Sequence, residues 1–372
     1  MVEPKAFVES LAALGVTYYT GVPDSLLKEL CAYVTENLPE RDHVIAANEG
    51  AAVGLAAGYH LATGKAGVVY MQNSGTGNAI NPLLSLADPE VYAIPMLVVI
   101  GWRGEPGVHD EPQHKKQGRV QEALLKALEY PYEVMSEEPG EALRQVDRLV
   151  VATREKSSPA VLLVRKGAFA PYAMKAQPAP AYPMMREEAI RLVLAAAGEN
   201  GRVVSTTGMA SREIYELREA AGQGHGRDFL TVGSMGHALM IATGLAAASE
   251  GRVWCVDGDG AAIMHLGSLG IAARRAPASF RHVVLNNGAH DSVGGQPTIG
   301  HSLPFTEIAK ALGYKTALRA DTREELEKAL AALEGAEGPA FLEIRLRGGA
   351  RKDLGRPKTS PVENKAAFMA RG

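Results

Sequence analysis

The chain has 372 residues, of which 46% are hydrophobic and 22% charged, and its formal net charge is −3 at pH 7. This composition is typical of a globular protein with a large core, and the charge balance argues against nucleic acid as a partner. The two cysteines, Cys31 and Cys255, lie far apart and predict no disulfide framework. A charged-then-apolar leader and an apolar run of membrane length are both missing. The sequence therefore predicts a cytoplasmic protein with no membrane partner.

Strand and helix patterns alternate along almost the whole chain. Helical periodicity is clearest over 141–156 and 322–335. Near-continuous apolar strands separated by helices predict parallel sheets covered on both faces, which is an α/β fold class. The predicted strands are 16–20, 43–47, 66–72, 94–102, 131–135 and 159–166 in the first half, and 202–207, 229–233, 252–257, 282–287, 314–319 and 340–346 in the second.

A Pro- and Ala-rich stretch, "GAFAPYAMKAQPAPAYPMM" at 167–185, interrupts this alternation and divides the strands into two equal sets. We therefore predict two doubly wound parallel-sheet domains of similar architecture, over 1–170 and 186–372, joined by a linker at 171–185. The cationic C-terminal segment, 347–372, has two open interpretations, a solvated tail and a flap over a functional site.

Oxygen-bearing side chains follow two successive strands of the second half. "GDG" at 258–260 places Asp259 at the end of one strand, and Asn286 and Asn287 end the next. Ligands of open parallel sheets bind at these carboxyl ends, and the helix starting near Ala261 directs its free N–H groups there. Taken alone, "GDG" is a common tight turn and does not predict a metal site. With the two amides it predicts Mg²⁺ bound together with a diphosphate.

In the first half, Glu49 begins a predicted helix with small residues at 52, 54 and 56–58. The carboxylate can simply complement the helix dipole. A helix face of small residues also permits close packing of another helix, so we predict a subunit interface here. At such an interface Glu49 would be desolvated and able to exchange a proton with a bound base.

The stretch 101–119 is predicted to be a long loop with several cations and two histidines. It is either a solvated loop or a site for an anionic substrate. "NSGTGN" at 73–78 resembles part of a phosphate-binding loop, but G-K-[ST] does not follow it, so a Walker motif is excluded. No G-x-G-x-x-G follows the first strand, which disfavours a dinucleotide site.

Together these motifs resemble the thiamine-diphosphate-dependent decarboxylases. The resemblance covers nearly the whole chain, and it implies a pyrimidine-binding domain followed by a diphosphate-binding domain. "GDG" with "NN" resembles the cofactor motif of this family, "NEGAAVGLAAGY" at 48–59 its pyrimidine-domain helix, and "GSMG" at 233–236 the segment supporting the bent cofactor. The branch acting on phosphonopyruvate is resembled by "GVPDSLLK" at 21–28, "DEPQHKKQGR" at 110–119, "LNNGAHDSVGGQPT" at 285–298 and "GRPKTSPVENK" at 355–365.

The resemblance also implies roles for individual residues, with thiamine diphosphate and Mg²⁺ as cofactors. The Asp259 and Asn287 side chains and the Ala289 carbonyl would bind the metal. Glu49 would contact the pyrimidine N1′, the Gly233 carbonyl would accept from its amino group, and Met235 would wedge between the rings. The diphosphate would lie against Gly258, Gly260 and Ala261, beside the loop with Thr207 and Gly208. His290 or His114 would be the proton donor.

The implied reaction is the conversion of 3-phosphonopyruvate, a small anionic 2-oxo acid, to phosphonoacetaldehyde and CO₂ in phosphonate biosynthesis. Ser25, Lys115 and Arg119 are the candidates for binding it. The cofactor would lie between subunits of a homo-oligomer, at least a dimer. Two alternatives remain, a carboligating enzyme of the acetolactate synthase type and a sulfopyruvate decarboxylase. The latter is disfavoured because that enzyme is often split into two chains and because its motif over 286–298 differs.

Overall fold

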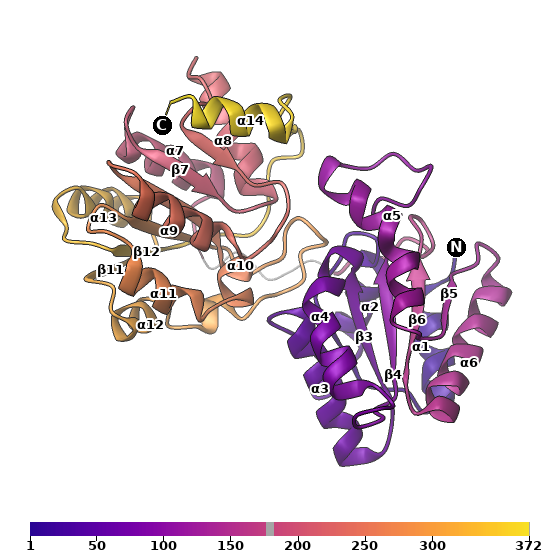
Figure 1. Ribbon diagram of the computed structural model, residues 1–372. Coiled ribbons are helices and arrows are strands. Elements are labelled where there is room, and N and C mark those ends of the chain that lie inside the picture. The colour runs from indigo at the N-terminus through magenta and orange to yellow at the C-terminus, as the bar shows by residue number, and fades with distance from the viewer. Residues whose placement is uncertain (176–181, 372) are drawn as a thin grey trace. The chain divides into compact units, whose positions relative to one another are not determined.

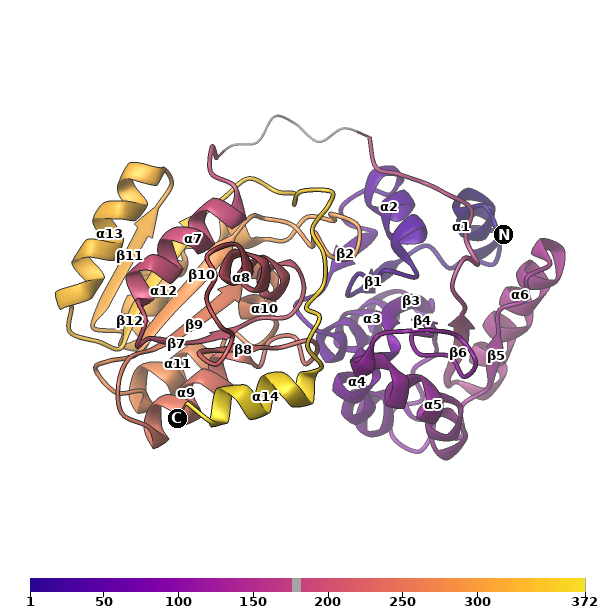
Figure 2. The same cartoon turned by 90° about the horizontal axis from the view of Figure 1, so that it is seen from above.

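The computed structural model describes residues 1–175 and 182–371. The chain divides into two compact units, Met1–Gln177 and Pro178–Gly372. The division falls within the stretch predicted as a linker, 171–185, of which 176–181 lie outside the described residues. Figure 1 and Figure 2 show each unit as a sheet with helices on both sides. No helix of the described chain is long and apolar enough to span a membrane.

The first unit alternates helices and strands from its first residues. Its helices are α1 (Pro4–Ala13), α2 (Lys28–Asn37), α3 (Glu49–Thr63), η1 (Asn73–Gly75), α4 (Thr76–Pro82), η2 (Leu83–Ala87), α5 (Pro112–Ala127) and α6 (Pro139–Lys156). Its strands are β1 (Tyr19–Gly21), β2 (His43–Ile45), β3 (Gly67–Gln72), β4 (Met96–Gly101), β5 (Tyr132–Val134) and β6 (Pro159–Val164).

The second unit repeats the pattern. Its helices are α7 (Arg186–Ala197), α8 (Met209–Ala220), α9 (Ala238–Ala248), α10 (Asp259–Met264), α11 (Ser268–Arg275), η3 (Gly300–Ser302), α12 (Phe305–Leu312), α13 (Arg323–Gly335) and α14 (Pro361–Met369). Its strands are β7 (Arg202–Ser205), β8 (Asp228–Leu230), β9 (Val253–Gly258), β10 (Arg281–Asn286), β11 (Thr316–Ala320) and β12 (Ala340–Arg345).

Both sheets have six strands in the same order. The sheets run β2-β1-β3-β4-β6-β5 and β11-β12-β10-β9-β7-β8, and all paired strands are parallel. Counting β7 to β12 as first to sixth, the second order read backwards is 2-1-3-4-6-5, which is the order of the first sheet. The predicted α/β fold class, with two doubly wound sheets of similar architecture, is confirmed, and a strand overlaps each of the twelve predicted ranges.

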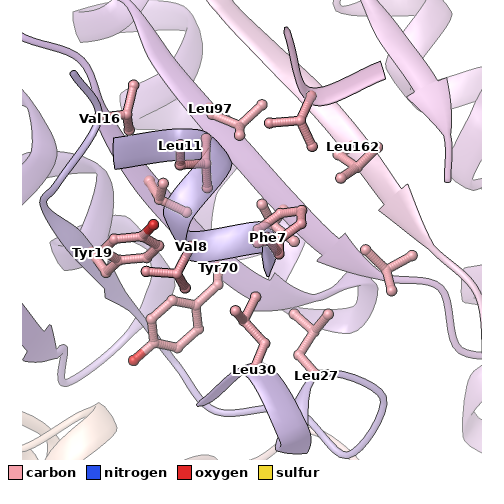
Figure 3. Close-up of a cluster of buried hydrophobic side chains, with 14 of the residues drawn as sticks. Phe7, Val8, Leu11, Val16, Tyr19, Leu27, Leu30, Tyr70, Leu97 and Leu162 are labelled. Atoms are coloured by element: carbon pink, nitrogen blue, oxygen red, sulfur yellow. The ribbon is translucent and has the colours of Figure 1, made fainter. Parts of the chain in front are cut away.

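Alternating strand residues feed two cores in each unit, because successive side chains point to opposite faces of a sheet. Val68 and Tyr70 of β3 face the core under α1, α2 and α6, whereas Val69 and Met71 face the core under α3, α4 and α5. Figure 3 shows Phe7 and other α1 side chains packed in the first of these cores. The second unit has the same two-sided arrangement. The loops at the strand ends are therefore carried on rigid layers.

The C-terminal segment is packed against the second unit. Helix α14 begins at a capping box in which the Ser360 side chain and the Glu363 backbone and side chain bond reciprocally. Asn364 then accepts from the backbone N–H of Leu230 at 3.1 Å and donates to the carbonyl of Asp228 at 2.8 Å. These bonds attach α14 to the edge strand β8. Of the two interpretations of this tail, free solvation does not describe α14.

Candidate active site

The carboxyl ends of β9 and β10 lie side by side and carry the predicted metal ligands of the second unit. Asp259 is the first residue of α10 and is only 2% exposed. Its carboxylate accepts hydrogen bonds from the Thr298 hydroxyl and from the backbone N–H of Gly260 and Asn287. Burial raises the pKa of Asp259 to about 6 against the effect of these bonds. Within residues 1–175 and 182–371 no cationic side chain pairs with Asp259. A bound cation would therefore offset the energetic cost of keeping this buried carboxylate charged.

The amide pair after Leu285 is fixed through its nitrogen atoms. Asn286 Nδ2 donates to the Gly300 carbonyl at 2.9 Å and to Glu343 at 2.8 Å, while its buried Oδ1 has no hydrogen-bond partner in the described chain. Asn287 Nδ2 donates to Asp291 at 2.7 Å, which leaves Oδ1 with a long contact of 3.4 Å to the N–H of Ala289. Both amides therefore present oxygen atoms for a further ligand.

The close approach of the chain at Gly300 brings the carboxylate oxygen of Asp259 and the amide oxygen of Asn286 together. A Cβ at Gly300 would lie 2.4 Å from Asp259 Oδ2 and 2.5 Å from Asn286 Oδ1, so only glycine fits between them. With the Asn287 amide oxygen and the Ala289 carbonyl from the adjoining loop, they would make an all-oxygen set of the kind that Mg²⁺ prefers. The residues present fit a magnesium ion, and they place Asn286 beside the predicted ligands Asp259 and Asn287.

The loop at 205–208 lies next to "GDG". A Cβ at Gly258 would lie 3.8 Å from the Thr206 methyl group, and one at Gly208 would lie 3.6 Å from Ser292. Gly208 has φ 93°, a left-handed conformation that glycine adopts without strain. Thr207 and Gly208 are partly exposed between these contacts, as is Gly258. Backbone groups of this edge are therefore accessible to a ligand such as a diphosphate.

Met235 and His290 meet over Gly260. A Cβ at Gly260 would lie 3.0 Å from the His290 ring and 3.3 Å from Met235 Cε. The preceding Ser234 has φ 56°, which is strained for a residue with a side chain and is typical of functional turns. Burial lowers the pKa of His290 to about 4 although Asp291 opposes the shift. His290 is thus neutral near pH 7, a form less suited to the predicted role of proton donor than an imidazolium.

Two other predicted cofactor contacts flank this cluster. Gly233 is partly exposed one residue before Ser234, and Ala261 is buried in α10. The carbonyl of Ala261 lies 3.3 Å from the position of a Cβ on Gly236. The segment "GSMG" therefore packs directly on the helix that begins with Asp259.

In the first unit, Glu49 lies buried at the start of α3, 5% exposed. Its Oε2 accepts from Asn78 Nδ2 at 2.8 Å. A Cβ at Gly75 would lie 2.1 Å from its Oε1, so the turn over Asn73–Gly75 closes against the carboxyl group. Burial raises the pKa of Glu49, and the Asn78 amide and the Glu49 backbone N–H oppose the shift. Such a carboxyl group is suited to sharing a proton with a bound base.

The small residues after Glu49 are divided between two faces of α3. Ala52, Ala56 and Ala57 are buried in the core of the unit itself. They are therefore not available for a subunit interface, contrary to the sequence-based prediction. Gly54 and Gly58 are exposed, with nothing within 4 Å of a Cβ on either. Periodicity showed that the helix has small faces, but the position of the sheet decides which of them is covered.

The predicted loop at 101–119 is a loop only as far as Glu111. Helix α5 begins at Pro112, whose ring fixes φ for a first helical position, and the Trp102 indole donates to the Gly118 carbonyl at 2.9 Å. Few apolar residues occur in this stretch of the helix, so its periodicity is weak. His114 is buried in the first turn, whereas Lys115 and Arg119 are exposed on α5.

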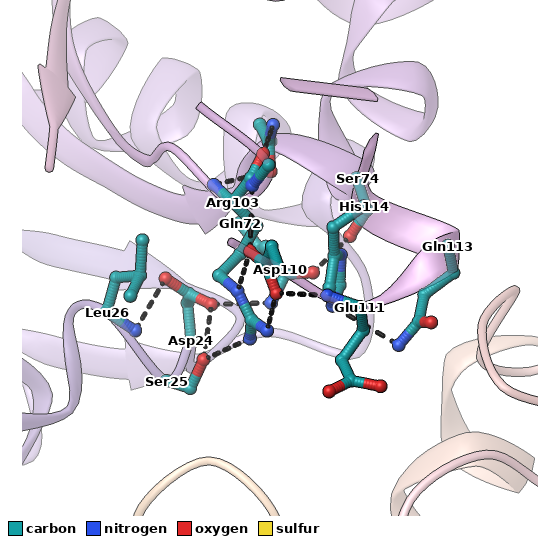
Figure 4. Close-up of polar contacts among 12 residues, drawn as sticks. Asp24, Ser25, Leu26, Gln72, Ser74, Arg103, Asp110, Glu111, Gln113 and His114 are labelled. Carbon is teal, nitrogen blue, oxygen red and sulfur yellow. Dashed lines mark hydrogen bonds and ion pairs between the residues drawn. The ribbon is translucent and has the colours of Figure 1, made fainter. Parts of the chain in front are cut away.

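Ser25 lies in the loop that follows β1, and in the described part of the chain it contacts neither of those two cations. Its hydroxyl accepts a hydrogen bond from Nη1 of Arg103 at 2.7 Å (Figure 4). Sequence reasoning counted Arg103 among the loop cations without selecting it. It also missed Asn78, Asp291 and Thr298, which fix Glu49, Asn287 and Asp259 respectively. The signal available for Asn78 was its place in "NSGTGN", directly after the third strand.

Comparison with known proteins identifies the class. The family model "Thiamine pyrophosphate enzyme, N-terminal TPP binding domain" matches residues 4–126, and its C-terminal counterpart matches 206–344. Two relatives are 34% identical to this chain over essentially its whole length, so the chain belongs to the thiamine pyrophosphate (thiamine diphosphate) enzymes.

The particular relatives are decarboxylases. The two at 34% identity are named phosphonopyruvate decarboxylase, from Streptomyces hygroscopicus (98% of this chain, 92% of the relative) and Streptomyces viridochromogenes (100% and 95%). A sulfopyruvate decarboxylase from Methanosarcina acetivorans is 27% identical over 92% of this chain and 90% of its own length.

Proposed function

We propose that this chain decarboxylates 3-phosphonopyruvate to phosphonoacetaldehyde and CO₂, with thiamine diphosphate and Mg²⁺ as cofactors. The observation that carries the proposal is the full-length identity of 34% to two phosphonopyruvate decarboxylases, against 27% to a sulfopyruvate decarboxylase. Oxygen ligands around Asp259 and a buried Glu49 support the two cofactor roles. We also propose that the reaction takes place in the cytoplasm as part of phosphonate biosynthesis.

The residues of the second unit would bind and orient the cofactor. Asp259, Asn287 and the Ala289 carbonyl offer oxygens to Mg²⁺, and Asn286 adds another at the same edge. Backbone groups from Thr207 to Gly208 and from Gly258 to Ala261 are suited to the diphosphate. When bound, thiamine diphosphate supplies the electron sink needed for loss of CO₂ from a 2-oxo acid.

The residue proposed to move a proton is Glu49. Its carboxyl group is desolvated by its own unit and is oriented by Asn78 and by the backbone at Gly75. A proton held at this oxygen can be shared with a ring nitrogen of the bound cofactor at little cost in reorganisation. His114 and His290 remain the candidates for the donor that protonates the product.

Two alternatives concern the substrate and the product. Sulfopyruvate differs from phosphonopyruvate only in its acidic group. A single chain does not exclude this substrate, because the Methanosarcina relative is also one chain, matched over 90% of its length. That both domains lie in one chain is therefore only a weak argument against sulfopyruvate as the substrate. Carboligation of the acetolactate synthase type would also release CO₂, but it would join two substrate molecules into a larger product and would yield no aldehyde.

We further propose a homo-oligomer, at least a dimer. Helix α3 exposes apolar and small residues, namely Ala51, Gly54, Leu55, Gly58 and Leu61. Leu61 is 76% exposed, which is unusual for leucine and typical of a contact surface when such residues are contiguous. Equilibrium sedimentation of the purified protein tests this: a monomer at micromolar concentration with full activity would contradict it.

A substrate panel tests the proposed reaction. The purified protein with thiamine diphosphate and Mg²⁺ is assayed for aldehyde with phosphonopyruvate, sulfopyruvate and pyruvate. We expect kcat/KM for phosphonopyruvate to exceed that for sulfopyruvate at least about 10-fold, since a tetrahedral dianion and a monoanion differ in charge at one binding site. A higher kcat/KM for sulfopyruvate would show that the protein is a sulfopyruvate decarboxylase. Formation of acetolactate from pyruvate would show carboligation.

A further inference from the structure

Arg103 is held rigidly where β4 ends. Its backbone N–H donates to Asn73 Oδ1 at 3.2 Å, and its carbonyl accepts from Asn73 Nδ2 at 2.8 Å. Asn73 follows β3 directly, so one buried amide joins the ends of two neighbouring strands. The side chain of Arg103 is 17% exposed. The cation therefore lies at the carboxyl edge of the sheet rather than free on the surface.

The guanidinium group is oriented on one side by Asp110 (Figure 4). Nε lies 2.8 Å from Asp110 Oδ2, and Nη2 lies 2.5 Å from Oδ1. Asp110 also accepts from the backbone N–H of Gly104 and Glu111. Although burial opposes it, these bonds lower the pKa of Asp110, so the pair stays ionised. A bidentate pair fixes the plane of the arginine and leaves its remaining donors in a defined direction.

Ser25 lies on the other side of the arginine. Its hydroxyl accepts from Arg103 Nη1 at 2.7 Å. The loop is fixed by the fully buried Asp24, which accepts from Gln72 Nε2 at 2.5 Å and from the N–H of Leu26 at 3.0 Å. A Cβ at Gly101 would lie 1.9 Å from Asp24 Oδ2, so the ends of β1, β3 and β4 converge on this carboxyl group.

The position of this cluster in the fold points to a ligand. β1 and β3 are adjacent, yet β2 lies outside β1 and β4 lies outside β3. The strand order therefore changes direction between β1 and β3, and ligands of doubly wound sheets bind at that crevice. Asp24 and Gln72 bridge it.

Glu49 lies along the same edge. Ser74 Oγ donates to Gln72 Oε1 at 2.7 Å, and the next residue, Gly75, contacts the Glu49 carboxyl group. The chain of contacts thus runs from the acid proposed for proton transfer to the arginine within one rigid unit.

We propose that Arg103 and Ser25 bind the anionic head group of the substrate, the phosphonate in phosphonopyruvate. This assignment rests on the proposed function for the identity of the head group. A guanidinium has five N–H donors, of which the contacts to described residues given above use three. The Ser25 hydroxyl donates to Asp24 Oδ1 over a long 3.5 Å, so it can rotate to donate to a bound oxyanion instead. Lys115 and Arg119, the cations that the sequence suggested, are exposed on α5, and no comparable network fixes them within residues 1–175 and 182–371.

The test separates head-group binding from the rest of the reaction. Variants Arg103→Lys and Ser25→Ala are compared with wild type for kcat/KM on phosphonopyruvate and on pyruvate, which has the same 2-oxo acid without the phosphonate. Each variant should lower the ratio of phosphonopyruvate to pyruvate at least about 10-fold, mainly through KM, because a charge-assisted hydrogen bond is lost. Equal losses on both substrates would overturn the assignment.

A binding measurement makes the result independent of turnover. Calorimetric titration uses 3-phosphonopropionate, an inert analogue without the keto group. Arg103→Lys and Ser25→Ala should weaken its binding at least about 10-fold, while the exposed Lys126→Met, on the same helix as Lys115, should not change it. Unchanged binding in both variants, or a comparable loss in Lys115→Met or Arg119→Met instead, would overturn the proposal.

These readouts distinguish failure of this assignment from failure of the proposed function. If wild type prefers sulfopyruvate, the substrate named above is wrong. The same ratio measured with sulfopyruvate over pyruvate would then still confirm or overturn the role of Arg103. Melting temperatures of all variants, measured by circular dichroism, show whether a loss of binding reflects a loss of folding.

Discussion

At the scale of single residues, Glu49 shows how burial and hydrogen bonding set a chemical role. Burial raises its pKa, while Asn78 and its own backbone N–H act in the opposite direction. The carboxyl group is held in place because Gly75 has no side chain to displace it. A residue that is desolvated, oriented and near the crevice is a stronger candidate for proton transfer than its position at a helix start alone would suggest.

Replacing Glu49 by Gln should therefore separate chemistry from binding. We expect kcat to fall about 10²- to 10⁴-fold, the usual contribution of a positioned acid or base. Binding of thiamine diphosphate with Mg²⁺, measured by calorimetry, should change far less. The exposed Glu155→Gln serves as the matched control on α6 and should behave as wild type. Retention of full turnover by Glu49→Gln would remove Glu49 from the mechanism.

Asp291 is predicted to position the metal ligand Asn287. Its carboxylate accepts from Asn287 Nδ2 at 2.7 Å, from Arg186 at 2.8 Å and from the N–H of Gly349 at 3.0 Å. A carboxylate only accepts hydrogen bonds, so Asp291 holds the Asn287 amide with Nδ2 toward it and Oδ1 away from it. The amide in Asp291→Asn can also donate, so Asn287 would lose this fixed orientation. Outer partners of this kind typically contribute 10- to 100-fold in metal affinity, so we expect about that loss in Mg²⁺ binding.

The measurement for Asp291 is a Mg²⁺ titration at saturating thiamine diphosphate, followed by calorimetry. Asp353→Asn is the control, because Asp353 is 82% exposed in the neighbouring tail segment. Equal Mg²⁺ affinity in Asp291→Asn and wild type would show that the Asn287 orientation does not depend on this carboxylate.

At the scale of elements, the partly buried His43 of strand β2 makes the stability of the first unit depend on pH. His43 Nε2 lies 2.8 Å from the Tyr70 hydroxyl, and burial lowers the pKa of His43 to about 4. The unfolded chain therefore takes up a proton near pH 6.5 that the folded strand does not accept until about pH 4. Stability from this residue is complete above pH 6.5 and is lost as the pH falls toward 4.

We predict that wild type loses about 2 kcal/mol in free energy of unfolding through His43 between pH 7.5 and pH 5, since each pKa unit corresponds to about 1.4 kcal/mol. His43→Gln should lack this part of the acid sensitivity. Urea unfolding followed by circular dichroism at the two pH values measures both. Equal pH-dependent losses in the two proteins would mean that other groups cause the acid sensitivity.

The elements were more predictable than the contacts between them. Apolar strands such as 96–101 and 281–286 could be recognised because parallel strands are buried on both faces. Asp259 and Asn287 could be selected because strand ends of a parallel sheet converge. Arg103 and Asp291 could not, because their roles depend on partners far along the chain or across a loop, and Pro112 starts a helix where weak periodicity suggested a loop.

At the scale of the whole molecule, the two units share one strand order and differ in the residues at the strand ends. The third strand is followed directly by Asn73 in the first unit and by Asp259 in the second. After the fourth strand, the first unit carries Arg103 at the second position and the second unit carries Asn287 at the first. The same crevice thus carries oxygen ligands in one unit and a fixed cation in the other. The two units thus share one architecture and differ in the strand-end residues that carry the chemistry.

The most direct test of the central claim is the fate of phosphonopyruvate followed by ³¹P NMR. The protein is freed of cofactor, then restored with thiamine diphosphate and Mg²⁺. The account predicts that the phosphonopyruvate signal is replaced by that of phosphonoacetaldehyde, with one CO₂ released for each substrate, and only when both cofactors are present. Phosphonopyruvate that stays intact under conditions in which the same sample consumes sulfopyruvate or pyruvate would contradict it.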